Sequence, residues 1–271
     1  VAVDNKGALG ASADGVLTHG AKIIHPPETV LDFSGNNSSG TYIEVGRGTG
    51  DNLAITGDLT IETWVRLDSL KLQNIVSFSK TSLGDPESVN DLYSLWFDAN
   101  GDVKFGHEGS SGADKDATFD TNLTAGQWVH LAAGRDSSNK TQTLYLNGEK
   151  FGIAAYNEDV VGGAQSNLYI GLSSRGTLND DRLNGQLSDL RIWNTARTAD
   201  EITDNYLHKL EGAHTGLKLN FHFDEGTGSS VKDSSGAQTG ADATKAITNT
   251  ANWIDTAPDV FGTKIETQEN E

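Results

Sequence analysis

Cysteine and methionine are both absent from this sequence of 271 residues, and proline occurs only four times. The lack of cysteine excludes disulfide bonds, zinc–thiolate sites, iron–sulfur clusters and cysteine nucleophiles. Because no methionine stands even at position 1, we expect the chain to be a processed product or a piece of a longer protein. No apolar run is long enough to span a bilayer, and no signal peptide is recognisable, so direct membrane insertion is not expected.

Positive charge is also scarce, since 20 Lys and Arg residues face 38 Asp and Glu residues and leave a formal net charge of −18. This balance disfavours nucleic acid as a partner, because phosphate binding requires a basic surface, and it disfavours an anionic membrane surface for the same reason. Such acidity is typical of soluble extracellular proteins, many of which bind calcium through surplus carboxylates. The alternative is that the charge only keeps the surface soluble.

Short β-type runs separated by polar turns fill most of the chain, which contains 31 glycines. Several runs alternate with a period of two, as Ile61, Thr63 and Val65 do against the residues between them. The expected strands are 30–34, 41–45, 59–67, 74–79, 93–97, 103–107, 128–134, 143–146, 167–170, 185–193 and 217–223. Residues 98–102 and the pair Asn147-Gly148 have the composition of hairpin turns.

One short helix is expected after the run that ends at Trp193. Residues 198–201 read Thr-Ala-Asp-Glu, which is the pattern of a capping box, and Ile202, Tyr206 and Leu207 then share one face. Many strands with a single helix predict an all-β sandwich rather than alternating βα units.

The two ends of the chain differ from its middle. Residues 1–28 are small, polar and glycine-rich, and we interpret them as a lead-in arm or an edge strand. Residues 29–255 form the expected domain. Residues 256–271 have the pattern of a linker followed by the start of another repeat.

Two segments carry a family resemblance. Residues 123–132, LTAGQWVHLA, followed by residues 143–148, TLYLNG, resemble the hallmark of laminin-G-like domains in the concanavalin A-like lectin/glucanase superfamily. The runs 31–45, 59–65 and 185–202 fit the same family in the same order, so the resemblance covers roughly residues 30–224. It implies a jelly-roll sandwich of two curved antiparallel sheets.

Two C-terminal segments add to this resemblance. Residues 223–236, FDEGTGSSVKDSSG, resemble a motif that bacterial members carry before their first strand. Here the motif follows the last expected strand, which implies either a permuted arrangement or a final strand that completes the sheet. Residues 256–270 resemble the start of a cadherin-like repeat of large bacterial surface adhesins, which implies an extracellular, cell-surface location and adjacent domains in a longer chain.

Catalysis is not expected. Glucanases of this superfamily carry a Glu-x-Asp-x-x-Glu run that supplies two close carboxylates, one as nucleophile and one as acid. No Glu of this chain is followed two residues later by Asp, so that motif is absent.

Two acidic loops are candidate calcium sites, since calcium takes six to eight oxygen ligands from carboxylates, amides and carbonyls. The candidate metal ligands are Asp85, Glu87, Asn90 and Asp91 in the first loop and Asn179, Asp180 and Asp181 in the second. The resemblance extends to pentraxins, and it implies that the two loops hold calcium jointly. The alternative is that both loops are merely solvated.

A sugar site on such a fold combines an aromatic platform with planar polar groups and in some cases a calcium ion. The candidate ligand-binding residues are Trp96, His107, Tyr156, Arg175 and Asn184. We therefore expect a calcium-dependent, lectin-like module that binds cell-surface or biofilm glycans in adhesion. A protein-binding or structural calcium-stabilised module is the first alternative, and an accessory module of a polysaccharide-degrading enzyme is the second.

Overall fold

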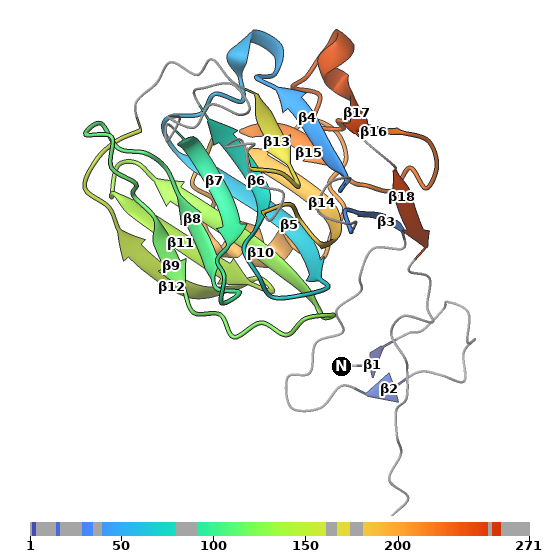
Figure 1. The fold of residues 1–271 in the computed structure, drawn as a ribbon, viewed down its shortest axis with the longest axis horizontal. Helices are drawn as coiled ribbons and strands as arrows, with labels where there is room; N and C mark the ends of the chain where they lie inside the picture. The colour runs from blue at the N-terminus through green and yellow to red at the C-terminus, as the bar shows by residue number, and fades with distance from the viewer. Residues whose placement is uncertain are drawn as a thin grey trace, which may run out of the picture.

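Two antiparallel β-sheets of eight strands each make up the body of the molecule (Figure 1). This computed structural model describes residues 2–3, 15–16, 29–34, 40–79, 91–160, 167–173, 181–248 and 251–255. The sheets enclose one continuous apolar core to which strands of both contribute. The predicted all-β sandwich with one short helix is therefore confirmed.

Sheet 1 has the strand order β12-β11-β10-β5-β14-β3-β18, and β15 pairs with β14 beside β3. Its strands are β3 (Thr29–Asp32), β5 (Leu59–Leu67), β10 (Trp128–Asp136), β11 (Thr141–Leu146), β12 (Glu149–Ala155), β14 (Gly185–Trp193), β15 (Leu217–Phe221) and β18 (Asn252–Asp255).

Sheet 2 has the strand order β16-β17-β4-β13-β6-β7-β8-β9. Its strands are β4 (Tyr42–Gly46), β6 (Gln73–Ser79), β7 (Asp91–Phe97), β8 (Val103–Gly106), β9 (Ala117–Phe119), β13 (Leu168–Ile170), β16 (Ser230–Lys232) and β17 (Thr244–Thr248). The remaining elements are the strands β1 (Ala2–Val3) and β2 (Gly15–Val16), which pair with each other, the helix α1 (Ala199–Asn205) and the 3₁₀ turns Thr49–Asp51 and Gly240–Ala243.

Period-two alternation sorts the side chains of the long strands. On β7, Tyr93, Leu95 and Phe97 belong to the buried core between the sheets, whereas Trp96 between them is half-buried and lies on the other face. The same alternation on β5 directs Ile61 and Val65 into the core.

The chain after α1 completes both sheets. β17 pairs with β4 in sheet 2, and β18 pairs with β3 in sheet 1, so residues 252–255 lie beside residues 29–32. Of the two arrangements predicted for the C-terminal segment, this is the one in which a final strand completes the sheet. Across the part of the chain that the structure describes, no helix has the length and apolar character needed to cross a membrane.

Candidate functional site

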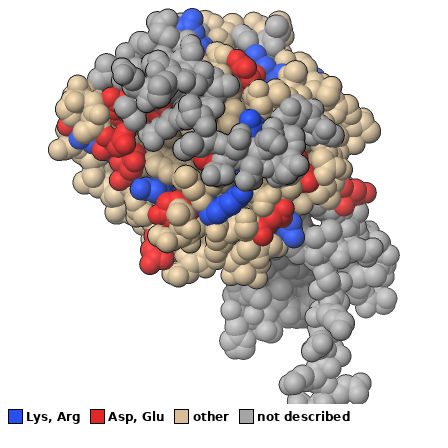
Figure 2. Space-filling view, viewed as in Figure 1, with Lys and Arg blue, Asp and Glu red and all other residues tan. Residues whose placement is uncertain are grey.

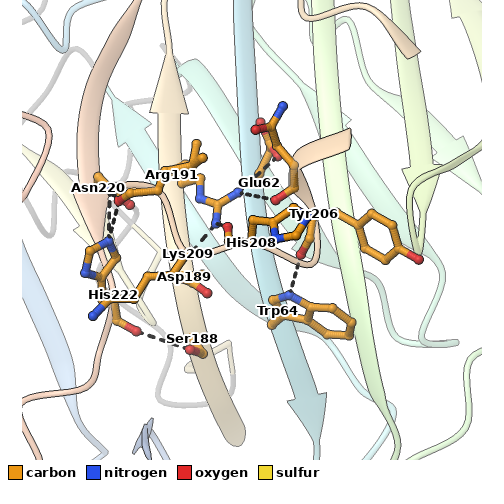
Figure 3. A network of polar contacts seen from close by, with 12 residues as sticks. Glu62, Trp64, Ser188, Asp189, Arg191, Tyr206, His208, Lys209, Asn220 and His222 are labelled. Carbon is orange, nitrogen blue, oxygen red and sulfur yellow. Dashed lines mark hydrogen bonds and ion pairs between the residues drawn. The ribbon is translucent and has the colours of Figure 1, made fainter. Parts of the chain in front are cut away.

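The outward face of sheet 1 is covered by α1 and the segment that follows it (Figure 3). The indole Nε1 of Trp64 donates a hydrogen bond to the backbone oxygen of Tyr206 at 3.0 Å, and the two rings stack with centroids 6.1 Å apart. The helix begins with the predicted capping box, in which Glu201 N donates to Thr198 Oγ1 and Thr198 N donates to Glu201 Oε2. The part of this face over β5 and β10 is therefore covered by the protein itself.

A buried charge cluster lies beneath this cover. Glu62 is fully buried, and its carboxylate is 2.7 Å from Arg197 Nη1, 3.9 Å from Arg191 Nη1 and 3.8 Å from His130 Nε2. Arg191 also donates a hydrogen bond to the backbone oxygen of Asn205, at the end of α1. Burial, and then the charges of Arg191 and Arg197, hold the pKa of His130 well below its ordinary value, so its ring is neutral. His130 is thus a buried packing residue of this cluster.

The outward face of sheet 2 has a different character. The strand register places Asn74, Trp96, Lys104 and Thr118 in one row across β6, β7, β8 and β9. Trp96 and Lys104 are half-buried, and Lys104 Nζ lies 5.7 Å from the centre of the Trp96 ring. Among the described residues, no helix packs on this row.

A second row runs beside the first on the same face. The register aligns Glu44, Tyr169, Ser77 and Ser94 across β4, β13, β6 and β7. Ser94 Oγ donates a hydrogen bond to Asp91 Oδ2 at 3.0 Å and lies 3.3 Å from Ser77 Oγ. Asn167 Nδ2 donates to Glu44 Oε1. Tyr169, Ser77 and Ser94 are buried, so the accessible part of this face is the row of Trp96, Lys104 and Thr118. An aromatic ring beside an ammonium and a hydroxyl group is chemistry that contacts hydroxylated ligands.

Three of the predicted site residues meet at the Trp96 end of this face. Asn74 N, which is in register with Trp96, donates a hydrogen bond to the backbone oxygen of Asp181 at 2.8 Å. Asn184 N donates to Gln73 Oε1 at 2.9 Å, on the residue next to Asn74. The structure therefore brings Trp96, Asp181 and Asn184 to one end of the β6–β7 pair.

Asp91 lies at the opposite end of the same strand pair. It pairs with Ser79, five residues along β7 from Trp96, which corresponds to about 17 Å at ~3.4 Å per residue. The prediction that the two acidic loops hold one calcium ion jointly is therefore not supported for Asp91 and Asp181, because the antiparallel register separates them. Within the described ranges, no three His, Asp or Glu side chains are grouped as metal ligands, so these residues alone do not fit a calcium ion.

The other predicted metal ligands and one predicted ligand-binding residue lie outside the described residues. They are Asp85, Glu87, Asn90, Asn179 and Asp180, and Arg175.

His107 and Tyr156 come together at a different place. Their ring centroids are 4.8 Å apart with an interplanar angle of 84°. His107 is only 1% exposed, so it packs behind Tyr156 instead of lining an open surface as predicted. Tyr156 does line a cavity, next to Gln142 and Asn157.

Sequence reasoning missed Asn74, Ser77, Ser94 and Tyr169. The available signal was the alternation of Ser77 and Ser94 with the apolar residues beside them, whereas Asn74 shares its parity with the core residue Val76 and reaches the outer row through a bulge. Tyr169 gave no such signal, since β13 has only three residues and all are buried.

Three comparisons with known proteins bear on this geometry. A family profile described as "Concanavalin A-like lectin/glucanases superfamily" matches residues 37–203. No curated protein sequence matches the chain.

Two solved structures are similar in fold. A "putative carbohydrate binding protein" from Bacteroides ovatus superposes with a TM-score of 0.64 and 18% identity, over 86% of this chain and 61% of that one. This chain thus spans less than two thirds of that protein. The CBM40 of a Ruminococcus gnavus IT-sialidase, bound to α2,3-sialyllactose, superposes with a TM-score of 0.53 and 14% identity, over 65% of this chain and 95% of that one.

Proposed function

Since the chain belongs to the concanavalin A-like lectin/glucanases superfamily, we propose that it is a non-catalytic carbohydrate-binding module. One observation carries this proposal. Of the two outward sheet faces, that of sheet 1 is covered by the segment at α1 over β5, whereas that of sheet 2 presents Trp96 in a row of polar side chains on which no described helix packs. The structures similar in fold include proteins named for carbohydrate binding, which supports the same class of ligand.

The mechanism is passive recognition. The indole of Trp96 offers an apolar surface for the CH groups of a sugar ring, and Lys104 and Thr118 offer groups that bond its hydroxyls. Rigid β-strands position all three, so little conformational entropy is lost on binding. Single sites of this kind bind in the mM to µM range, and adhesion then depends on several sites acting together.

The chemistry of this face favours binding over hydrolysis. Its carboxylates, Asp91 and Glu44, already accept hydrogen bonds from Ser94 and Asn167. They lie on β4 and β7, and β13 and β6 lie between these strands. The two carboxylates are therefore too far apart to act as the general acid and nucleophile of a retaining glycosidase, which lie ~5 Å from each other. We place no catalytic step on these residues.

The proposal extends to calcium-dependent adhesion to cell-surface glycans outside the cell. Its basis is the sequence: the charge of −18, the two acidic loops and the resemblance of residues 256–270 to adhesin repeats. The alternative is a module that binds a protein or serves only as a structural unit.

A glycan array tests this proposal, with the whole chain applied once in millimolar calcium and once in EDTA. We expect sugars to bind, and we expect Trp96→Ala to abolish their signal while Phe151→Ala does not. Phe151 is a matched control because it is a 44% exposed aromatic residue on β12 of sheet 1.

Each outcome has a definite meaning. Binding that disappears in EDTA supports the calcium-dependent form of the proposal, and binding that persists in EDTA removes calcium from it. If no glycan binds in either buffer, or if Trp96→Ala binds as wild type does, the proposed site is wrong, and a protein ligand or structural role takes its place.

A further inference from the structure

The first and the last strand of the sandwich, β3 and β18, lie side by side at one edge of sheet 1 (Figure 1). They pair antiparallel over four residues each. The register partners are Asp32 and Asn252, Leu31 and Trp253, Val30 and Ile254, and Thr29 and Asp255. The chain enters this pair at Thr29 and leaves it at Asp255. The two directions in which the sequence continues therefore start from the same place.

This register decides how tension on the chain acts on the domain. Residues 1–28 precede Thr29 and residues 256–271 follow Asp255, so a pull on these two segments draws Thr29 and Asp255 apart. The backbone hydrogen bonds of an antiparallel pair are perpendicular to the strands. A pull that starts at two register partners is directed along these bonds, and it loads them one pair after another. Strands pulled from opposite ends would instead share the load over all their bonds.

β18 has less support than the strand that precedes it in the chain. It stands last in the order of sheet 1, so within the described residues it pairs on one side only, and none of its four residues is fully buried. β17 pairs with both β16 and β4, and its Ile247 belongs to the buried core. Weakly packed edge elements open locally before a domain unfolds globally. Separation that begins at Asp255 is therefore expected to stop at β17.

Side chains add to the pairing of β18 one residue at a time. Asn252 Nδ2 donates a hydrogen bond to Asp32 Oδ2 at 2.6 Å. Trp253 Nε1 donates to the backbone oxygen of Gly228 at 2.9 Å. Ile254 packs, partly buried, against the cluster on the outward face of sheet 1. Because each contact belongs to a single residue, each is lost as that residue separates and none delays the separation of the residue before it.

β3 is fixed more firmly than its partner. It pairs on its other side with β14, and Val30 and Leu31 are fully buried. Phe33 N, just after β3, donates a hydrogen bond to the backbone oxygen of Gly185 at 2.8 Å. Of the two strands under tension, β18 is therefore the one that leaves.

The load does not pass through the proposed sugar site. Trp96, Lys104 and Thr118 are on β7, β8 and β9 of sheet 2, and in the described sheets neither β3 nor β18 pairs with these strands. Figure 1 places β18 at the right and β8 and β9 at the left, and Figure 2 shows Asp and Glu side chains at the surface of both edges. The strand under load and the binding row are thus at opposite edges of the domain.

We propose that β18, residues 252–255, is a tension-release element. It detaches from β3 before either sheet opens, and the chain lengthens while the body of the domain stays folded. Release frees residues 249–255, which adds at most about 24 Å of chain at ~3.4 Å per residue. This inference uses none of the residues of the Trp96 row, so either proposal can fail without the other.

Optical tweezers on the whole chain test this proposal. Because the chain has no cysteine, Glu28→Cys and Thr256→Cys introduce the only two thiols, and handles coupled to them load the strand pair directly. We expect a small, reversible extension of at most about 24 Å before the main unfolding transition. Handles at Glu28→Cys and Thr250→Cys form the matched control. They load β3 and β18 from opposite ends, so the small extension should be absent while the main transition remains.

Two further variants locate the extension, both with handles at residues 28 and 256. Asn252→Ala removes the hydrogen bond to Asp32, and it should lower the force of the small extension and leave that of the main transition unchanged. Asn139→Ala removes a similar hydrogen bond, to Asp136, far along the chain and should leave the small extension as in wild type. Absence of a small extension in wild type, its persistence with handles at residues 28 and 250, or an unchanged force in Asn252→Ala would each overturn this proposal.

Discussion

Trp64 and Tyr206 are joined twice, by a hydrogen bond of 3.0 Å from the indole Nε1 to the backbone oxygen and by stacking of their rings at an interplanar angle of 27°. Val30 and Trp128 complete the same buried cluster on the outward face of sheet 1. The contact fixes the chain just after α1 to β5, and so it covers this part of the sheet 1 face. The proposed ligand site lies on the other sheet, at the half-buried Trp96.

Thr198→Ala should destabilise the N-terminus of α1, the helix on the outward face of sheet 1. The substitution removes the hydroxyl that accepts from Glu201 N, and N-cap losses of this kind cost about 1 kcal/mol. We expect the free energy of unfolding in urea to fall by that amount. Thr124→Ala, at an exposed threonine without a cap, should change it by less than about 0.5 kcal/mol. Equal stability of the two variants would contradict the role assigned to the capping box.

Glu62→Gln should be far more destabilising. Glu62 is the shared carboxylate of Arg191, Arg197 and His130, and its loss removes the counter-charge of Arg197 and leaves Arg191 only Asp189, at 3.9 Å. Breaking one partner of a buried ion pair costs roughly 3–5 kcal/mol. Urea unfolding measures the effect, and Glu149→Gln, at an exposed position on β12, is the matched control. A loss below about 1 kcal/mol would show that the cluster contributes little to stability.

The long strands could be predicted from the sequence because their two faces differ. On β5 and β7, apolar residues recur at every second position, and the predicted ranges 59–67 and 185–193 coincide with the observed strands. β9, β13 and β16 have three residues each, which is too short for a period of two to be counted. Their positions depend on pairing with neighbours that are distant in sequence.

For the candidate site, the sequence predicts only how side chains are oriented within each single strand. Alternation shows that Trp96 faces away from Tyr93 and Phe97, but it does not show that Asn74 and Lys104 lie beside it. That neighbourhood depends on the strand register, which long-range contacts set. The same register attaches Asp91 and Asp181 to opposite ends of one antiparallel pair, and the joint calcium site stays a prediction, since its other ligands lie outside the described residues.

His107 should make stability depend on pH. Its pKa in the folded chain is about 4, below the ordinary value of 6.5, chiefly because of burial. Between these values the unfolded chain binds a proton that the folded chain does not, so stability falls as the pH drops from about 6.5 towards 4. The contribution is on the order of 2 kcal/mol. Urea unfolding at both ends of this window measures it.

His107→Gln isolates this contribution, because glutamine can still donate to the backbone oxygen of Glu158 without titrating. The variant should lose less stability than wild type between the two pH values. His214→Gln replaces an exposed histidine and should behave as wild type. If His107→Gln lost as much stability as wild type on acidification, carboxylates and the other histidines would account for the whole pH dependence.

Trp96 should report directly on the sugar that it binds. Trp64, Trp128 and Trp193 are buried at 2%, 9% and 4% exposure, and Trp253 already donates its indole N–H to the backbone oxygen of Gly228. A sugar stacked on Trp96 replaces water at the half-buried ring of the proposed site, and it should shift the tryptophan emission to shorter wavelength. Titration of a glycan found on the array, followed by fluorescence and calorimetry together, measures the shift and the affinity.

Two substitutions of Trp96 test whether the sugar stacks on this ring. Trp96→Phe keeps an aromatic surface, so we expect it to abolish the emission shift yet retain measurable affinity, while Trp96→Ala should weaken binding about tenfold or more, equivalent to ~1.4 kcal/mol. Phe151→Ala, on the other sheet, should preserve both signals. An emission shift that survives in Trp96→Phe would mean that the sugar is sensed by another tryptophan, and the row formed by Asn74, Trp96, Lys104 and Thr118 would then not be where it binds.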